Sequence, residues 1–518
     1  MSSSAQCLFR ADASPRVGIG HVMRCLALAR AWQAGGGRSV FLSYCQGKTL
    51  CQRLAAEGIE QIGLTEVHPD PEDLKSALQA LRAISRTSSG SQGTAPDALA
   101  SGWCVLDGYH FDPAYQRALR VAGCRLLVID DTAHWPEYHA DIVLNQNITA
   151  NQLTYTCNSD ATVLLGTRYV LLRPEFLAWR GWERKTPEVA RRVLVTMGGA
   201  DEGNVSLQVI QMLQHVGIRD LEVKVLIGPA NTHLPVLRES VASLGFTTEL
   251  LTEVTDMPGT MAWADVAISG AGSTCWELAF MGVPSIVLTL AENQAAIAAE
   301  LQAGGVAVHF GRPSRLNGPD LSEALLQLAA TRNTRALMSE RGRSLVDGWG
   351  ADRVVMRMRG ERVRLRLATS ADARLLWEWA NETTTRAASF SSDPILWTQH
   401  VTWLEGRLKD PNCLFWIAVD GDDVPAGQVR MEVDGAEAVI SVGLDAKCRG
   451  RGYGGVMIRK ATERLFRVSG VRVIHAYIKP GNEASVSAFH KAGFRKTGMT
   501  RVRDQAAVDF TLLKEDAE

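Results

Sequence analysis

The sequence of 518 residues contains no run of 18 or more apolar residues, the least that a membrane-spanning helix needs. Its amino-terminal end also lacks the basic stretch and long apolar segment of a secretion signal. Neither charge is in excess, since 55 Lys and Arg residues face 56 Asp and Glu residues. This balance excludes a strongly basic coat for nucleic acid or for an anionic membrane. We therefore expect a cytoplasmic protein with small-molecule partners, a monomer or a weak oligomer.

Paired cysteines are also missing. The ten cysteines are scattered along the chain, and none forms a CxxC motif. Disulfide frameworks and zinc sites both need closely spaced cysteines, so this pattern is typical of small core residues in a reducing compartment. We predict neither disulfides nor a metal site.

Apolar residues make up 46% of the chain, which is enough for several hydrophobic cores. At about 150 residues per domain, the length predicts three to four domains. In the first two-thirds, short apolar segments alternate with helical patterns such as that of residues 21–32. This alternation predicts an α/β fold with parallel sheets covered on both faces. The expected strands there are residues 6–10, 39–43, 103–106, 125–129, 142–144, 193–196, 223–227, 266–269, 285–290 and 306–310.

Composition changes mark the domain boundaries. A charged segment with Pro and Trp near residues 173–192 is expected to join two sub-domains, and after residue 360 the strands take on an antiparallel, α+β pattern. We therefore predict three domains at 1–170, 171–355 and 361–518. Residues 85–101 are rich in Ser, Gly and Thr, which favours a flexible loop.

The first candidate site is a glycine turn between a strand and a helix, formed by Gly18, Ile19 and Gly20 and followed by His21. Glycines allow a ligand close to the backbone, and a helix N-terminus offers free N–H groups. The helix dipole disfavours the imidazolium form, so His21 is a candidate general base. A capping or buried histidine is the alternative interpretation.

A second glycine turn has the same strand-turn-helix setting at residues 269–277. Backbone amides after Gly272, with the hydroxyls of Ser273 and Thr274, are suited to a diphosphate. Glu277, one turn into the helix, can accept hydrogen bonds from two neighbouring hydroxyls, although a solvated helix residue would look the same. Asn293 begins a later helix, where an N-cap is an equally good interpretation.

These motifs resemble the UDP-sugar hydrolases of pseudaminic acid biosynthesis, relatives of the MurG-type glycosyltransferases with the two-domain GT-B fold. The resemblance implies that His21 is the general base and that the second glycine turn binds UDP. It also implies that the substrate is bound on the sugar side by Asp12, Gly18, Gly20 and Tyr109. It implies a Glu277 contact to the ribose, an Asn293 contact to the nucleotide sugar, and no metal. The matching segments are RAD (10–12), GIGHVMRCLALA (18–29), VLDGY (105–109), IDD (129–131), VLNQN (143–147), MGGAD (197–201) and residues 269–284.

A third glycine turn, RGRGYG at 449–454, follows a strand ending at Leu444 and opens a helix. It resembles the pyrophosphate loop of the GNAT acetyltransferases, and an exposed basic turn is the alternative. The resemblance implies acetyl-CoA as cosubstrate. The expected coenzyme contacts are Leu444, Arg449, Gly450, Arg451, Gly452, Gly454 and, in the segment NEASVSAFHKAGF, Asn482.

One position departs from that pattern. Many GNAT enzymes have a tyrosine seven residues after the matching asparagine as the acid toward the leaving thiolate, and here the residue is Phe489. Phe cannot donate a proton, so water, His490 or another hydroxyl takes that role, or the register differs. His400, in a stretch that resembles amino-sugar N-acetyltransferases, is a candidate base or substrate contact.

Together the resemblances imply a fusion of two consecutive enzymes, an acetyltransferase acting on a UDP-4-amino sugar and a hydrolase acting on its product. A UDP-sugar glycosyltransferase fused to an acetyltransferase is the first alternative. A non-catalytic nucleotide-sugar sensor is the second.

Overall fold

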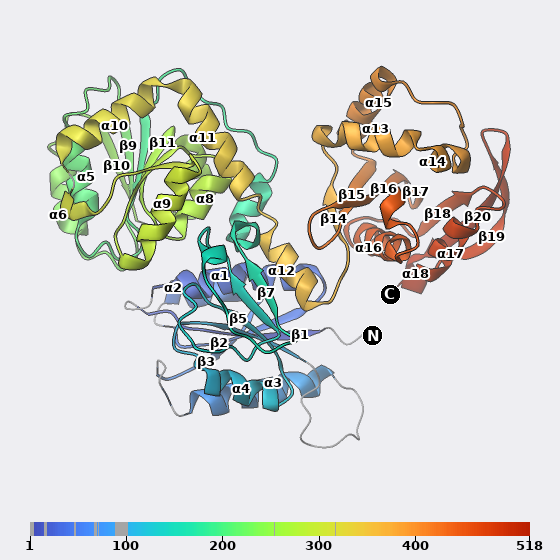
Figure 1. Ribbon diagram of the computed structural model, residues 1–518, viewed down its shortest axis with the longest axis horizontal. Coiled ribbons are helices and arrows are strands. Elements are labelled where there is room, and N and C mark those ends of the chain that lie inside the picture. The colour runs from blue at the N-terminus through green and yellow to red at the C-terminus, as the bar shows by residue number, and fades with distance from the viewer. Residues whose placement is uncertain are drawn as a thin grey trace. The chain divides into compact units, whose positions relative to one another are not determined.

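The computed structural model describes residues 5–14, 18–45, 48–66, 70, 72–88, 102–252, 254–315 and 317–517. The chain divides into two compact units, Ser2–Val355 and Met356–Glu518. The first unit contains two parallel sheets and the second contains one mixed sheet (Figure 1). In the described part of the chain, no helix is both long and apolar enough to cross a membrane.

The first sheet has the strand order β3-β2-β1-β4-β5-β6-β7, with every neighbouring pair parallel. Its central strands are continuous apolar runs because helices cover both faces. The strands are β1 Gln6–Ala11, β2 Arg38–Ser43, β3 Glu60–Gly63, β4 Trp103–Asp107, β5 Arg125–Ile129, β6 Ile142–Asn145 and β7 Thr162–Leu165.

Four helices accompany this sheet: α1 Gly20–Ala34, α2 Lys48–Ala56, α3 Asp73–Ser88 and α4 Pro113–Val121. The loop expected over 85–101 is wrong for its first residues, because α3 continues to Ser88. Residues 89–101 lie outside the described residues.

The second sheet has the order β10-β9-β8-β11-β12-β13 and is also parallel throughout. Its strands are β8 Arg192–Thr196, β9 Glu222–Leu226, β10 Thr247–Leu251, β11 Val266–Gly270, β12 Ser285–Leu288 and β13 Ala307–His309. The accompanying helices are α5 Val205–Leu213, α6 Leu234–Val241, α7 Met257–Trp263, α8 Thr274–Phe280, α9 Ala295–Ala303, α10 Gly318–Ala330 and α11 Arg332–Leu345, followed by α12 Gly350–Met358.

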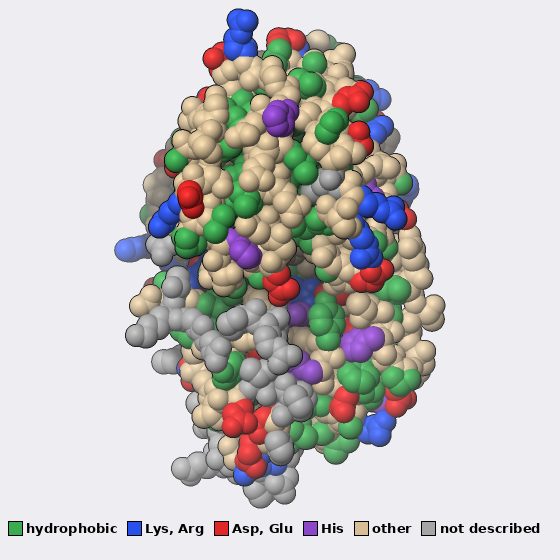
Figure 2. Space-filling model, turned by 90° about the vertical axis from the view of Figure 1, so that its left-hand side faces the viewer, with side chains coloured by type: hydrophobic (Ala, Val, Ile, Leu, Met, Phe, Trp, Pro, Cys, Tyr) green, Lys and Arg blue, Asp and Glu red, His purple; other side chains and the backbone are tan. Residues whose placement is uncertain are grey.

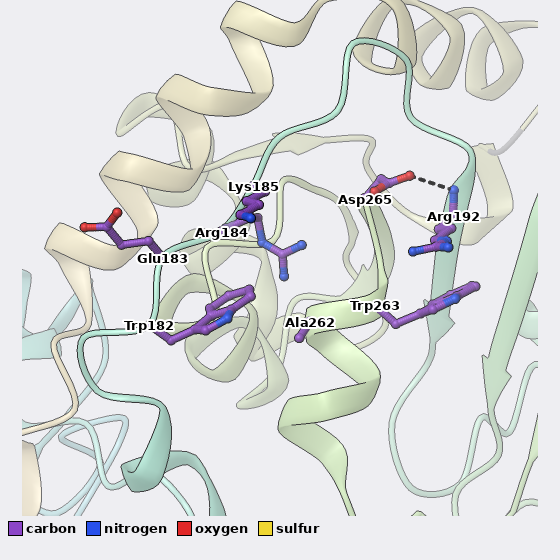
Figure 3. Close-up of a pocket in the computed structure, with 8 residues that line it drawn as sticks. All are labelled: Trp182, Glu183, Arg184, Lys185, Arg192, Ala262, Trp263 and Asp265. Carbon is purple, nitrogen blue, oxygen red and sulfur yellow. Dashed lines mark hydrogen bonds between the residues drawn. The ribbon is translucent and has the colours of Figure 1, made fainter.

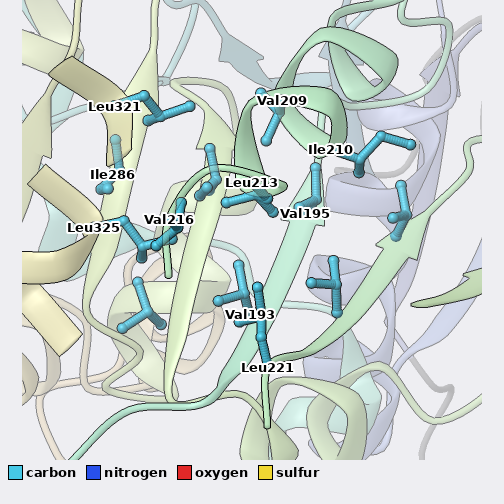
Figure 4. Close-up of a cluster of buried hydrophobic side chains, with 14 of the residues drawn as sticks. Val193, Val195, Val209, Ile210, Leu213, Val216, Leu221, Ile286, Leu321 and Leu325 are labelled. Carbon is cyan, nitrogen blue, oxygen red and sulfur yellow. The ribbon is translucent and has the colours of Figure 1, made fainter. Parts of the chain in front are cut away.

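One face of the second sheet carries a dense hydrophobic core (Figure 4). Val193 and Val195 of β8 lie under Val209 and Ile210 of α5, and Leu325 adds the contribution of α10. Both valines are buried, and they face the same core because side chains at alternate positions of a strand share one face. This core supports the strand ends that carry the second glycine turn.

The sheet of the second unit has the order β14-β15-β16-β17-β18-β20-β19. All its pairs are antiparallel except β17 with β18. The elements are β14 Arg364–Leu367, α13 Ala373–Asn381, α14 Thr383–Ala388, α15 Trp397–Lys409, β15 Cys413–Val419, β16 Pro425–Asp434, β17 Glu437–Leu444, α16 Tyr453–Val468, β18 Val473–Ile478, α17 Glu483–Lys491, β19 Arg495–Val502, β20 Gln505–Leu513 and α18 Lys514–Ala517.

The predicted fold class is confirmed, with two parallel Rossmann-like α/β sheets followed by an α+β unit. The three sheets fall within the residue ranges 1–170, 171–355 and 361–518, whereas the compact units number two. The three-domain division stays a prediction.

Candidate functional sites

His21 lies in the first turn of α1 and contacts Asp107, the last residue of β4. The distance from His21 Nδ1 to Asp107 Oδ1 is 2.6 Å. Arg24, one turn further along α1, donates from Nε to Asp107 Oδ2 at 2.5 Å and from Nη2 to Oδ1 at 2.6 Å. The strand order brings β4 beside β1, so residues 86 positions apart meet at one sheet edge.

Asp107 is fully buried. Burial by itself raises the pKa of a carboxyl, but the charges of Arg24 and His21 outweigh it and lower the pKa of Asp107 to about 2. A carboxylate that stays ionised accepts a hydrogen bond from a protonated Nδ1. The proton of the neutral His21 ring is then on Nδ1, and the free lone pair is on Nε2. This is the tautomer that a general base requires.

A second carboxylate, Asp131, joins the same cluster. Arg24 Nη1 donates to its two oxygens at 2.8 and 3.1 Å. The Tyr109 hydroxyl donates to Asp131 at 3.1 Å and the Asn147 side chain donates at 2.8 Å. The Tyr109 ring lies edge-on to the His21 ring at 5.4 Å and remains 43% exposed. Tyr109 therefore presents an accessible surface beside the candidate base.

The predicted sugar-side residues differ in their accessibility. Gly18 has a φ of 76°, which favours glycine, and both Gly18 and Gly20 are exposed beside His21. Asp12, by contrast, is 1% exposed and forms an ion pair with Arg10, and it also accepts from the Tyr44 amide at 2.8 Å. The described contacts therefore give Asp12 a structural role in holding this strand end.

Sequence reasoning missed Arg24, Asp107, Asp131 and Asn147 as site residues. Each lies in a segment already singled out by the resemblance, after or at the end of a predicted strand or in the first helix. The available signal was the rule that the carboxyl ends of parallel strands meet at one edge of the sheet.

The second glycine turn leads from β11 into α8. Gly272 is half-buried, Ser273 is exposed, and Thr274 begins the helix. Glu277 accepts from Arg173 Nε at 2.6 Å and from Nη2 at 2.8 Å. Burial raises the pKa of Glu277, and the charge of Arg173 opposes part of this rise. A carboxylate has about four acceptor positions, so the pairing with Arg173 leaves Glu277 able to accept from a ligand hydroxyl.

Asn293 is exposed and lies inside the short 3₁₀ helix Glu292–Gln294, whose N-cap is Ala291. The N-cap interpretation of Asn293 is therefore wrong. The neighbouring Gln294 accepts from the Leu290 amide at 2.9 Å and fixes this turn against the end of the β12 segment.

Figure 2 shows several histidine side chains close together, with acidic and basic side chains, around a recess on one face of the chain.

A separate shallow pocket of about 270 Å³ lies at the amino ends of β8 and β11 (Figure 3). The second glycine turn lies at the other, carboxyl end of β11. In the pocket, the Arg184 guanidinium donates to three backbone carbonyls, which gives it a structural role. Its lining residues are Trp182, Glu183, Arg184, Lys185, Arg192, Ala262, Trp263 and Asp265.

The third glycine turn connects β17 to α16. Gly450 and Gly452 have φ values of 73° and 82°, so this backbone path favours glycine. Arg449 donates to Glu382 at 2.7 Å and to the Leu444 carbonyl at 3.3 Å, and its hydrogen bond lowers the pKa of Glu382. Arg451 is exposed and Gly454 is buried in the first turn of α16. The turn therefore exposes its backbone together with one arginine.

Asn482 is the N-cap of α17 and accepts from the Ser485 amide at 3.2 Å. Phe489 is 6% exposed and packs edge-on against Phe494, so it is a core residue. His490 is exposed, with its ring edge-on to Phe510 at 5.3 Å. His400 is 3% exposed, and burial lowers its pKa.

Among the residues that the structure describes, no group of three or more His, Cys, Asp or Glu side chains is arranged to hold a metal ion. All ten cysteines are free thiols.

Two protein families match parts of the chain. Residues 192–347 match the glycosyltransferase family 28 C-terminal domain, and residues 362–495 match the acetyltransferase (GNAT) domain. The chain thus combines a glycosyltransferase-like part with a GNAT acetyltransferase fold.

The chain is similar to several curated proteins, three of which follow. The spore coat polysaccharide biosynthesis protein SpsG of Bacillus subtilis is 28% identical over 190 residues, covering 36% of this chain and 56% of the relative. The uncharacterized protein MJ1062 of Methanocaldococcus jannaschii is 21% identical over 499 residues, covering 94% and 96%. The pseudaminic acid cytidylyltransferase and UDP-2,4-diacetamido-2,4,6-trideoxy-beta-L-altropyranose hydrolase of Helicobacter pylori is 23% identical over 209 residues, covering 39% and 36%. The chain thus spans about half the length of SpsG and about a third of the Helicobacter protein.

Proposed function

We propose that the chain is a bifunctional enzyme of pseudaminic acid biosynthesis. The first unit hydrolyses UDP-2,4-diacetamido-2,4,6-trideoxy-β-L-altrose to UDP and the free sugar. The second unit acetylates the 4-amino group of the UDP-4-amino-4,6-dideoxy-N-acetyl-β-L-altrosamine precursor with acetyl-CoA. The activity for which the Helicobacter relative is named and the polysaccharide role of SpsG support a nucleotide-sugar substrate.

The observation that carries the hydrolase proposal is the contact of His21 with the buried Asp107. Nε2 of His21 takes a proton from water while the water oxygen attacks C1 of the sugar. The bond between C1 and the diphosphate oxygen breaks, and UDP leaves with the electron pair. Backbone amides and hydroxyls at Gly272, Ser273 and Thr274 stabilise the charge on UDP.

The acetyl-transfer proposal rests on the third glycine turn and on the GNAT match. The exposed backbone N–H groups of this turn, with Arg451 beside them, bind the coenzyme diphosphate. Asn482 at the start of α17 contacts the coenzyme arm. Acetyl-CoA is consumed as a cosubstrate, and no metal takes part in either reaction.

The first experiment incubates the purified chain with the UDP-4-amino sugar and acetyl-CoA, and identifies the products by mass spectrometry. Both free CoA and UDP are expected, and the absence of both contradicts the proposal. UDP release without any acceptor distinguishes hydrolysis from glycosyl transfer, because a glycosyltransferase needs the acceptor to turn over.

The second experiment replaces His21 by Gln and measures UDP release and UDP binding. Release is expected to fall at least 100-fold while UDP affinity stays within about threefold, since general-base catalysis contributes about 10²–10⁴ in rate. His215→Gln, an exposed histidine of the same unit, is the matched control. Retained release in His21→Gln refutes the role of His21. If the wild-type chain binds UDP but never cleaves the bond between UDP and the sugar, the result favours the sensor interpretation.

A further inference from the structure

One face of the sheet in the second unit carries an unassigned cluster of His475, Tyr477 and Asp509. Alternate residues of β18, such as Ile474 and Ala476, are buried in the core beneath α16. Strand alternation therefore places His475 and Tyr477 on the other face. The register of β18 with β20 sets Tyr477 opposite Asp509, so the three side chains share that face.

Direct contacts tie the cluster together. His475 Nδ1 lies 3.2 and 3.3 Å from the two carboxylate oxygens of Asp509. On the other side of the ring, Nε2 lies 3.7 Å from Glu437 Oε2, and the Tyr477 ring stacks on the imidazole at 6.0 Å. The His475 side chain is 19% exposed, so it is held in position and still reachable.

The cluster also lies where two strands of the sheet separate. β17 pairs with β18 only from Glu437 to Val439, and His475 is the last partner on β18. Beyond this point β17 continues to Leu444 and to the third glycine turn, a span of about 17 Å at 3.3 Å per residue. An extended thioester arm whose diphosphate sits on that turn can run back along β17, which brings its acyl end beside His475.

We propose that His475 is a catalytic base of the second unit, that Asp509 positions its ring, and that the acceptor is a primary amine. The proposal rests on the acetyl transfer proposed above. His475 Nε2 takes one proton from the protonated amine, whose lone pair then attacks the thioester carbonyl carbon. The C–S bond breaks with its electrons going to sulfur. One of the two protons left on nitrogen passes to the thiolate, and the other stays on the amide. The carboxylates of Glu437 and Asp509 suit a cationic acceptor.

Tyr477 adds a hydroxyl donor on the same face. Burial raises the pKa of Tyr477, and the charges of Asp509 and Glu437 raise it further, so the phenol keeps its proton. It is thus equipped to relay that nitrogen proton to sulfur, giving its own proton to the thiolate and taking one from nitrogen, which the buried Phe489 cannot do.

The test measures CoA release by the full chain with acetyl-CoA and a panel of amines that includes the UDP-4-amino sugar and simple amino sugars. His475→Gln is expected to lower kcat/KM about 100-fold or more at neutral pH while leaving acetyl-CoA affinity unchanged. The defect should shrink as the pH rises, because the amine then loses its proton to solvent. The charged and titratable groups that face His475 are Asp509, Glu437 and Tyr477.

Asp509→Asn should cause a smaller loss, confined to kcat with the KM for acetyl-CoA unchanged, since the His475 ring loses the partner that positions it. Asp504→Asn, in the turn before β20, is the matched control. An active wild type whose His475→Gln variant keeps its activity, or in which only His490→Gln is defective, overturns the role of His475. A wild type inactive with every amine contradicts the proposed acetyl transfer itself, and with it this role.

Discussion

Replacing Asp107 by Asn tests the geometry around His21 most sharply, because the variant keeps the shape of the side chain and changes its hydrogen-bonding pattern. Oδ1 of Asp107 accepts from both His21 and Arg24, and Oδ2 accepts from Arg24 Nε. An amide offers one acceptor oxygen and one donor nitrogen. With the nitrogen at the Oδ2 position, two donors meet at about the 2.5 Å that now separates Arg24 Nε from Oδ2. With it at the Oδ1 position, Nδ1 of His21 must accept, which moves the imidazole proton to Nε2.

Either orientation impairs the base, so UDP release by Asp107→Asn should fall about 10²–10⁴-fold, or about 3–5 kcal/mol in barrier. UDP affinity should stay within about threefold, because Asp107 does not face the second glycine turn in any described contact. The assay is a coupled measurement of UDP release at saturating substrate, with Asp112→Asn as control. Asp112 is the N-cap of α4, a position that Asn fills equally well. A fall of less than tenfold refutes the idea that Asp107 sets the tautomer of His21.

Three further outcomes concern stability and are measured by urea unfolding. Leu325→Ala, fully buried in the core of Figure 4, should cost about 2–5 kcal/mol, whereas Leu326→Ala, 41% exposed on the same helix, should cost little; equal effects contradict the packing. Gly228→Ala should destabilise by about 1–3 kcal/mol because its Cβ meets a backbone oxygen at 2.2 Å, while Gly245→Ala, with open space around it, should not. The pKa of Asp107, about 2 when folded and about 3.9 when unfolded, stabilises the chain by about 2–3 kcal/mol above pH 4. This contribution is lost as the pH falls through 2, and a wild-type acid profile identical to that of Asp107→Asn speaks against it.

The sequence predicted the central strands of both parallel sheets and one edge strand, β13, but not the other three edge strands. The expected segments 125–129 and 266–269 agree with β5 and β11 to within one residue, because both are buried on two faces and read as continuous apolar runs. The unpredicted β3, β7 and β10 are edge strands of four or five residues, in which Leu164 alone is buried. Such short and partly exposed segments carry too few apolar positions to be told from loops by their pattern.

The residues of the candidate site were also only partly predictable from the sequence. His21 was predictable because a glycine turn marks its position locally. Its partner Asp107 was not, because their contact depends on the order in which β1 and β4 lie in the sheet. The proton acceptor proposed for the second unit shows the same limit, since His475 and Asp509 are 34 residues apart and meet only through the pairing of β18 with β20.

The ion pair between Arg173 and Glu277 connects two equilibria. Arg173 also lies 3.4 Å from Glu175, which accepts from Arg53 of α2 at 2.6 Å, so a chain of charges leads from α8 to a helix of the first sheet. A ligand hydroxyl that bonds to Glu277 shares that carboxylate with Arg173. We therefore expect the free energy of the proposed ligand binding to be coupled to the free energy that holds α2 against this segment, and such a coupling is reciprocal. A substitution at Arg53, whose charge also acts on Glu277 and lowers its pKa, should change UDP affinity by the same factor by which UDP changes the strength of the Arg53 contact.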